Sequence, residues 1–211
     1  MTEFAPYLPG FLAAYAILFI AASSPGPAVA MLLGISTTQG RGAALTASAG
    51  IAMGSITINL LTLIGVGLLL HQAAWAMTVL RLAGSAYLLY LAWGSFGKAI
   101  RPPRVAVAEV APAPPLKWFT AGYLLQVTNP KAIAFWLAIA AVGATQGGGP
   151  TIIAAFVAGA FVISLFCHGA WAVILSSRPV RRAYETSRRW IDASLGAFFV
   201  FAAWKMATQR N

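Results

Sequence analysis

Long apolar stretches dominate the chain and are separated by short polar segments. Each stretch is close to the ~20 residues that a helix needs to cross the hydrocarbon core of a bilayer. The pattern predicts about six membrane-spanning helices, at 8–35, 43–70, 75–96, 118–142, 151–175 and 190–207. We therefore expect an all-α integral membrane protein.

A helix-breaking motif interrupts the first and the fourth of these stretches. The first copy reads SPGPAVAM, from Ser24 to Met31, and the second reads TNPKAIAF, from Thr128 to Phe135. Proline removes a backbone amide donor and clashes with the preceding turn of a helix, so we expect both stretches to split into half-helices. Paired breaks of this kind are the best sequence pointer to the substrate site of a transporter.

The residues at each break suit the start of a new helix. Asn129 can cap the helix that begins at Pro130, and Gly26 before Pro27 can play the same part more weakly. Each half-helix would begin near the middle of the membrane, with unpaired amides and the positive end of its dipole. An anion is the natural guest at such a position.

The two motifs align without a gap, which indicates two copies of one unit. A proline-rich basic segment, 98–117, separates a first three-helix repeat, 1–97, from a second, 118–211. Because each half has an odd number of crossings, the second half must enter the membrane from the opposite side. The expected architecture is an inverted repeat of two three-helix units with broken first helices, as in many secondary transporters.

Composition and charge narrow the class of protein further. Hydrophobic residues make up 60% of the chain and charged residues 9%, and the mean hydropathy is +0.79. A soluble domain of this length could not hide that much apolar surface. The net charge of +10 is divided among short loops, so we expect no nucleic-acid partner.

The basic residues predict the orientation of the chain in the membrane. Loops one, three and five share one side and carry Arg41, Lys98, Arg101, Arg104, Lys117, Arg178, Arg181, Arg182, Arg188 and Arg189. The other side has only Lys205 and Arg210. Short loops rich in Lys and Arg stay in the cytoplasm, so loop 98–117 is expected inside and both termini outside. Contact of the last basic loop with anionic membrane lipid remains open.

Several small, polar and aromatic residues have structural interpretations. Gly50 and Gly54 are spaced to let helices approach closely, and packing is their expected role. Asn59 either lines a cavity or bonds across helices. Three tryptophans stand at predicted segment starts and are expected to anchor them at the membrane interface: Trp75, Trp118 and Trp190.

Lys131 lies in the first turn after the second break, where its charge opposes the helix dipole. A buried ammonium is costly without a partner, and the chain has only four acidic residues: Glu3, Glu109, Glu185 and Asp192. We therefore expect a transported solute to supply the missing carboxylate. The predicted substrate-binding residues are Pro25, Gly26, Pro27, Ala28, Asn129, Pro130 and Lys131. Two other outcomes remain open: Lys131 reaches water along its apolar stem, or it pairs with Asp192.

With these motifs the chain resembles the LysE/RhtB family of amino-acid exporters, which are small bacterial inner-membrane proteins. The resemblance covers nearly the whole chain and rests on Pro25, Gly26, Pro27, Gly40, Gly50, Gly54, Gly65, Gly84, Tyr87, Leu88, Asn129, Pro130, Lys131 and Gly196. It implies a multi-pass protein of the inner (plasma) membrane that exports small amino acids or their derivatives, coupled to a proton or ion gradient. It implies neither a cofactor nor covalent catalysis.

Two positions depart from the family pattern. The family often has Asp or Asn after its Pro, Gly, Pro motif and a His past the second glycine of the second stretch, but this chain has Ala28 and Ile58 or its neighbours there. The missing carboxylate argues for a neutral amino acid as the substrate. His168 and Asp192 remain as candidates for coupling to a proton gradient, and the alternative for His168 is a bond to a neighbouring helix.

Other functions can be compared with the residue inventory. A membrane thiol-disulfide carrier needs a reactive cysteine pair, but Cys167 is alone. An intramembrane hydrolase needs a nucleophile with its base, and no such arrangement is apparent. The two His and one Cys are scattered, so no metal site is expected. A passive small-solute channel, an exporter of a non-amino-acid solute such as a metal ion, and assembly as a homo-oligomer remain open.

Overall fold

The computed structural model describes residues 3–72, 74–102 and 111–208. Its elements are η1 (Ala5–Tyr7), α1 (Leu8–Ser23), α2 (Pro27–Thr38), α3 (Gly40–Gln72), α4 (Ala74–Ile100), α5 (Pro115–Thr128), α6 (Pro130–Ala141), α7 (Pro150–Ile174) and α8 (Arg178–Thr208). No strand occurs within the described ranges. The predicted all-α class is confirmed.

Both expected breaks are present. Residues 24–26 separate α1 from α2, and Asn129 alone separates α5 from α6, with a bend of 60° between these two helices. Pro27 and Pro130 are the first residues of α2 and α6. At that position a helix makes no use of the backbone amide that proline lacks, so the same residue that ends one helix starts the next.

Four helical segments are long and apolar enough to cross a membrane: Ala5–Ser23, Gly40–Gly65, Pro150–Ile174 and Arg182–Thr208. The bent pair of α5 and α6 makes a fifth if it is counted as one span. This count covers only the described part of the chain. The protein is thus a helical membrane protein, whereas six spans and an inverted relation between the halves stay predictions.

The last helix is longer than expected. The apolar pattern predicted a segment from 190 to 207, but α8 already begins at Arg178. That boundary was wrong because the first turns of α8 are basic and polar, which interrupts the hydropathy pattern without preventing a helix.

The predicted basic linker, 98–117, overlaps two helices. α4 extends to Ile100, and α5 begins at Pro115. The part of the linker at 103–110 lies outside the described residues, so its role between two repeats stays a prediction.

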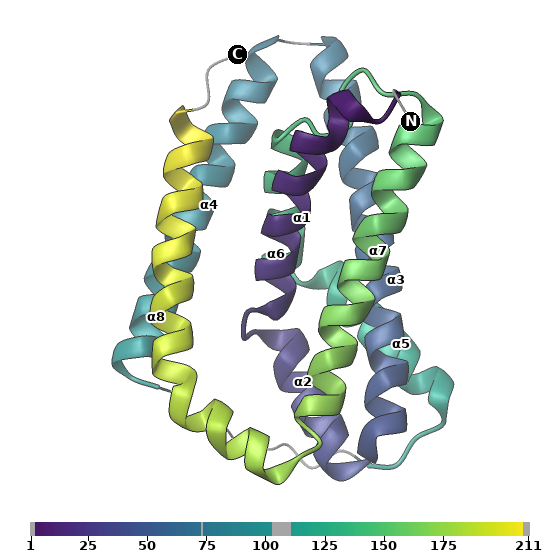
Figure 1. The fold of residues 1–211 in the computed structure, drawn as a ribbon, viewed down its shortest axis with the longest axis vertical. Coiled ribbons are helices and arrows are strands. Elements are labelled where there is room, and N and C mark those ends of the chain that lie inside the picture. The colour runs from purple at the N-terminus through teal and green to yellow at the C-terminus, as the bar shows by residue number, and fades with distance from the viewer. Residues whose placement is uncertain (1–2, 73, 103–110, 209–211) are drawn as a thin grey trace.

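The helices form an elongated bundle (Figure 1). α4 and α8 pack along each other on one side, whereas α3, α5 and α7 form the other side. The broken pair of α1 and α2 and the helix α6 run between these two groups, and both breaks lie near the middle of the long axis. α1 begins and α8 ends at the same end of the bundle. Which end faces the cytoplasm stays a prediction.

Glycines let α3 and α5 pack with their backbones in contact. A Cβ atom at Gly50 would lie 2.0 Å from the carbonyl oxygen of Phe119, and one at Gly122 would lie 2.2 Å from that of Ala47. Gly54 faces α5 as well, since its Cβ would lie 2.8 Å from the Cβ of Gln126. The predicted packing role of the two α3 glycines is confirmed, and this contact holds α5 at a defined height along α3.

Trp118 differs from the interfacial position expected of it. Its side chain is only 6% exposed and packs in a cluster with Leu32, Ile51 and Ala172. Trp75 and Trp190 are mostly exposed. The expectation failed for Trp118 because it rested on position along the chain, whereas α2, α3 and α7 cover this ring.

Candidate functional site

The two half-helices begin with different caps. The side-chain Oδ1 of Asn129 accepts a hydrogen bond of 3.0 Å from the backbone amide of Lys131, so the start of α6 is capped as predicted. Gly26 occupies the N-cap position of α2, where no side chain caps the helix. No acceptor is found within the described chain for the backbone amides of Ala28 and Val29. The start of α2 therefore offers the more open anion site.

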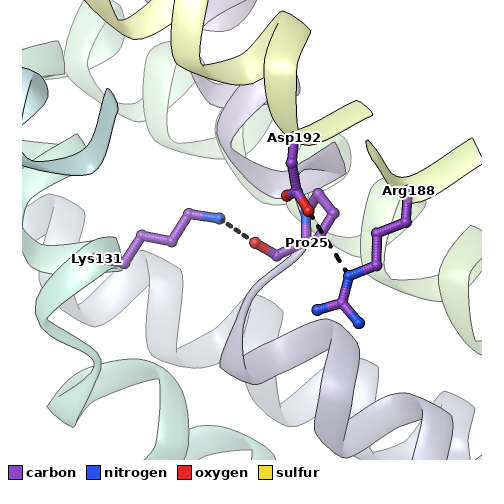
Figure 2. Close-up of polar contacts among 4 residues, drawn as sticks. All are labelled: Pro25, Lys131, Arg188 and Asp192. Carbon is purple, nitrogen blue, oxygen red and sulfur yellow. Dashed lines mark hydrogen bonds and ion pairs between the residues drawn. The ribbon is translucent and has the colours of Figure 1, made fainter. Parts of the chain in front are cut away.

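Lys131 connects the two breaks. Its ammonium donates hydrogen bonds of 3.2 Å each to the carbonyl oxygens of Ser24 and Pro25, and it also bonds the Ser24 hydroxyl. The contact with Pro25 is visible in Figure 2. The ammonium also lies 6.0 Å from the centre of the Phe135 ring. These oxygens come from the break between α1 and α2, where the interrupted helix keeps the amides of Ala28 and Val29 from bonding to them.

The glycine of the first break leaves room for this lysine. A Cβ atom at Gly26 would lie 3.1 Å from the Lys131 Nζ and 3.4 Å from its Cδ. The backbone of Gly26 is fully extended, with φ −178°, which other residues also adopt. Gly26 is therefore needed for space rather than for backbone conformation.

Asp192 lies close to the break between α1 and α2 but does not pair with Lys131. Its carboxylate is buried on α8 and lies 3.7 Å from the Nε of Arg188. Figure 2 shows it above Pro25, while Lys131 approaches Pro25 from another direction. Within the described residues, Lys131 makes no ion pair with a carboxylate. The alternative of a Lys131–Asp192 pair is therefore not observed, and neutral oxygens surround the lysine charge.

A small cavity lies between the two breaks. Its volume is about 40 Å³, which is room for roughly three water molecules. The cavity brings together most of the predicted site residues: Gly26, Pro27, Ala28, Asn129 and Lys131 line it, as does His168. Pro25, Pro130 and Asp192 do not line it.

A network of buried polar side chains forms one wall of the cavity. The Gln126 amide donates to the Ser55 hydroxyl at 2.8 Å, and the Ser55 and Ser164 hydroxyls are 3.1 Å apart. Ser55, Gln126 and His168 line the cavity. Ser55, Gln126 and Ser164 were not among the residues predicted from the sequence. The available signal was a polar residue within an apolar helix, which by itself does not show whether the side chain faces lipid, a neighbour or a cavity.

The hydrogen bonds of His168 assign its tautomer. Its Nδ1 lies 2.8 Å from the backbone carbonyl oxygen of Ser164 in the preceding turn. A carbonyl only accepts, so Nδ1 carries the hydrogen and Nε2 is an acceptor in the neutral ring. The histidine thus bonds its own helix rather than a neighbouring one, while its backbone oxygen accepts from Ser48 of α3 at 3.0 Å.

The described residues contain no group of three or more His, Cys, Asp or Glu that could hold a metal ion. The chemistry of the site is that of a charged lysine, helix-start amides and neutral hydrogen-bonding groups. Such a set has the chemistry to bind a small zwitterion or anion by electrostatics and hydrogen bonds.

The chain is similar to known transport proteins over most of its length. The family model for the LysE type translocator matches residues 19–210. The chain is 29% identical over 195 residues to the uncharacterized membrane protein YahN of Escherichia coli K12, covering 89% of this chain and 86% of that protein. No solved structure matches it.

Two relatives carry names that state a function. The threonine efflux protein of Escherichia coli K12 is 26% identical, covering 90% of this chain and 93% of the relative. The leucine efflux protein of Klebsiella pneumoniae is also 26% identical, covering 89% of each chain. The matches confirm the prediction of a transporter rather than an enzyme: the chain belongs to the LysE type translocator family.

Proposed function

We propose that the protein is a secondary carrier that exports small neutral amino acids from the cytoplasm by alternating access around the two breaks. The observation that carries this proposal is the Lys131 ammonium resting on the oxygens of Ser24 and Pro25. These oxygens form a site that accepts an ammonium group. The same lysine provides the positive charge that a carboxylate needs.

The two charged groups of an amino acid fit these two parts of the site. The substrate ammonium takes the oxygens of Ser24 and Pro25, and Lys131 then turns from them to the substrate carboxylate. The open amides of Ala28 and Val29 at the start of α2 provide further donors for that carboxylate. The start of α6 contributes less to carboxylate binding than expected, because the backbone amide of Lys131 already donates to the side chain of Asn129.

The size of the cavity indicates which state is observed. At about 40 Å³ the space is too small for an amino acid. The helices around the breaks must separate before the solute enters, and the contacts of Lys131 with Ser24 and Pro25 hold them together in its absence. Replacement of these contacts by contacts with the substrate gives binding a direct effect on the conformation.

The lining of the cavity supports a neutral side chain. No Asp or Glu lines it, so a cationic side chain would find no countercharge there. Two relatives are named as efflux proteins for threonine and for leucine, and both of these amino acids are neutral. For coupling to a proton gradient, His168 is the stronger candidate because it lines the cavity. Asp192 lies outside the cavity, beside Pro25.

The first test is efflux of a panel of labelled amino acids from preloaded bacterial cells that carry the wild type, Lys131→Ala or an empty vector. We expect faster loss of one or a few neutral amino acids with the wild type alone. No acceleration for any amino acid, with the protein present in the membrane, would contradict the proposal. Uphill export that an uncoupler abolishes would distinguish a carrier from a passive channel.

A further inference from the structure

A row of buried polar side chains on α3 continues beyond the cavity. Ser55 lines the cavity, Asn59 follows one helical turn later, and Thr62 lies almost one further turn along the same face. All three side chains are buried. α3 runs here toward the end of the bundle at which α1 begins (Figure 1). The row therefore points from the cavity to that end.

Asn59 differs from its two neighbours in the row because part of its side chain has no partner. Its amide nitrogen is buried and finds no hydrogen-bond acceptor in the described chain. The Ser55 hydroxyl bonds Gln126 and Ser164, and the Thr62 hydroxyl donates to the carbonyl oxygen of Ile58 at 2.6 Å. A buried donor without an acceptor is destabilising, so its presence in a membrane helix points to a function.

The packing of α3 on α5 places Asn59 near the second break. Gly50 faces Phe119 and Gly54 faces Gln126, so the two helices run in the same direction. Asn59 is five residues beyond Gly54, and the break at Asn129 is three residues beyond Gln126. At a rise of ~1.5 Å per residue, these positions lie within a few ångströms of the same height.

An apolar cluster separates the cavity from the end of the bundle in this direction. It contains Phe11, Trp136, Ile139 and Phe156 and includes Ile58, the residue next to Asn59. Trp136 also lines the cavity, so the cluster begins at the cavity wall. The polar row thus runs along a barrier that is closed in this structure.

We propose that Ser55, Asn59 and Thr62 line the route by which the solute moves between the cavity and the end of the bundle at which α1 begins. In this route the Asn59 amide is a second donor for the solute carboxylate after it leaves Lys131. The identity of the solute in this assignment rests on the proposed function, whereas the existence of the path does not. The route opens when the cluster around Phe156 separates.

The route can be tested by thiol labelling without knowledge of the solute. In a Cys167→Ser background, Asn59→Cys and Thr62→Cys are compared with Leu61→Cys, because the Leu61 side chain is 65% exposed on the surface of the bundle. The probe is 2-sulfonatoethyl methanethiosulfonate, a charged reagent that needs water to reach a thiol. We expect Asn59→Cys and Thr62→Cys to react at least roughly tenfold faster than Leu61→Cys, because only a hydrated path stabilises the thiolate that reacts. Equal or slower reaction of both variants would overturn the proposal.

The carboxylate contact is tested separately by export. Asn59→Leu keeps a similar volume and removes the donor, and we expect its efflux rate to fall about tenfold at unchanged membrane level. Thr57→Val is the control, since Thr57 lies on another face of α3, where its hydroxyl lies 3.3 Å from that of Tyr123. Full export by Asn59→Leu would contradict the proposed contact between the Asn59 amide and the solute carboxylate. Fast labelling together with no amino-acid export would instead reject the proposed function and retain the path.

Discussion

The Lys131 ammonium lies 3.2 Å from the carbonyl oxygen of Pro25, a residue 106 positions earlier in the chain. This contact joins the start of α6 to the break between α1 and α2 (Figure 2). The lysine has oxygen acceptors but no ion-paired carboxylate within the described residues. The side chain of Lys131 thus links the two breaks directly.

Removal of the lysine charge should slow export strongly. We expect Lys131→Met to lower the initial efflux rate by roughly ten- to a hundredfold, because a hydrogen bond to a charged group contributes about 1.5–3 kcal/mol and each 1.4 kcal/mol changes a rate about tenfold. Efflux of a labelled neutral amino acid measures the effect. Lys117→Met is the matched control, since it removes the same charge from an exposed position on α5. Equal loss in both variants would assign the effect to overall charge rather than to the site.

Larger side chains at Gly26 should slow export, because they take up the space that Lys131 occupies. Because a Cβ atom would lie 3.1 Å from the Lys131 Nζ, we expect Gly26→Ala to slow export severalfold and Gly26→Val to slow it further. Gly42→Ala is the control, because nothing lies within 4 Å of a Cβ atom there. Wild-type export by Gly26→Val would show that Lys131 does not need this passage.

The contact of α3 with α5 should be sensitive to a single methyl group. In Gly122→Ala the new Cβ would lie 2.2 Å from the carbonyl oxygen of Ala47, and two backbones cannot separate locally. We expect a loss of about 3 kcal/mol in stability, at the upper end of overpacking effects, seen as a lower melting temperature in detergent. Gly94→Ala should melt as the wild type does, since its Cβ meets nothing within 4 Å. Similar melting of all three proteins would refute the close contact.

The pH dependence of export should distinguish the two coupling candidates. Histidine is the side chain that ordinarily changes charge between about pH 5 and 8, and His168 lines the cavity. We expect wild-type export to vary with external pH in this range, Asp192→Asn to keep that profile, and His168→Ala to lose it. The measurement is the initial efflux rate at a series of external pH values. A flat profile shared by the wild type and His168→Ala would remove the coupling role of His168.

The sequence predicted the parts of the site that depend on local backbone chemistry. A proline lacks an amide hydrogen wherever the chain goes, so the breaks before Pro27 and Pro130 and the cap at Asn129 followed from a few adjacent residues. The charge of Lys131 in an apolar helix predicted a solute carboxylate as its partner, whereas its contacts with the oxygens of Ser24 and Pro25 were not predicted. The need for that partner is local, whereas its identity is not.

The tertiary structure decided which distant groups meet. The Ser24 and Pro25 oxygens on Lys131, and the wall of Ser55, Gln126 and His168, join positions that are far apart in the chain. Their meeting depends on how α1, α3, α5, α6 and α7 pack, down to the glycine contacts that hold α5 on α3. A polar residue in an apolar stretch looks the same in sequence whether it faces lipid, a neighbour or a cavity. Sequence by itself therefore determined where the helices break, and it predicted that the breaks carry function. Packing alone decided what faces them.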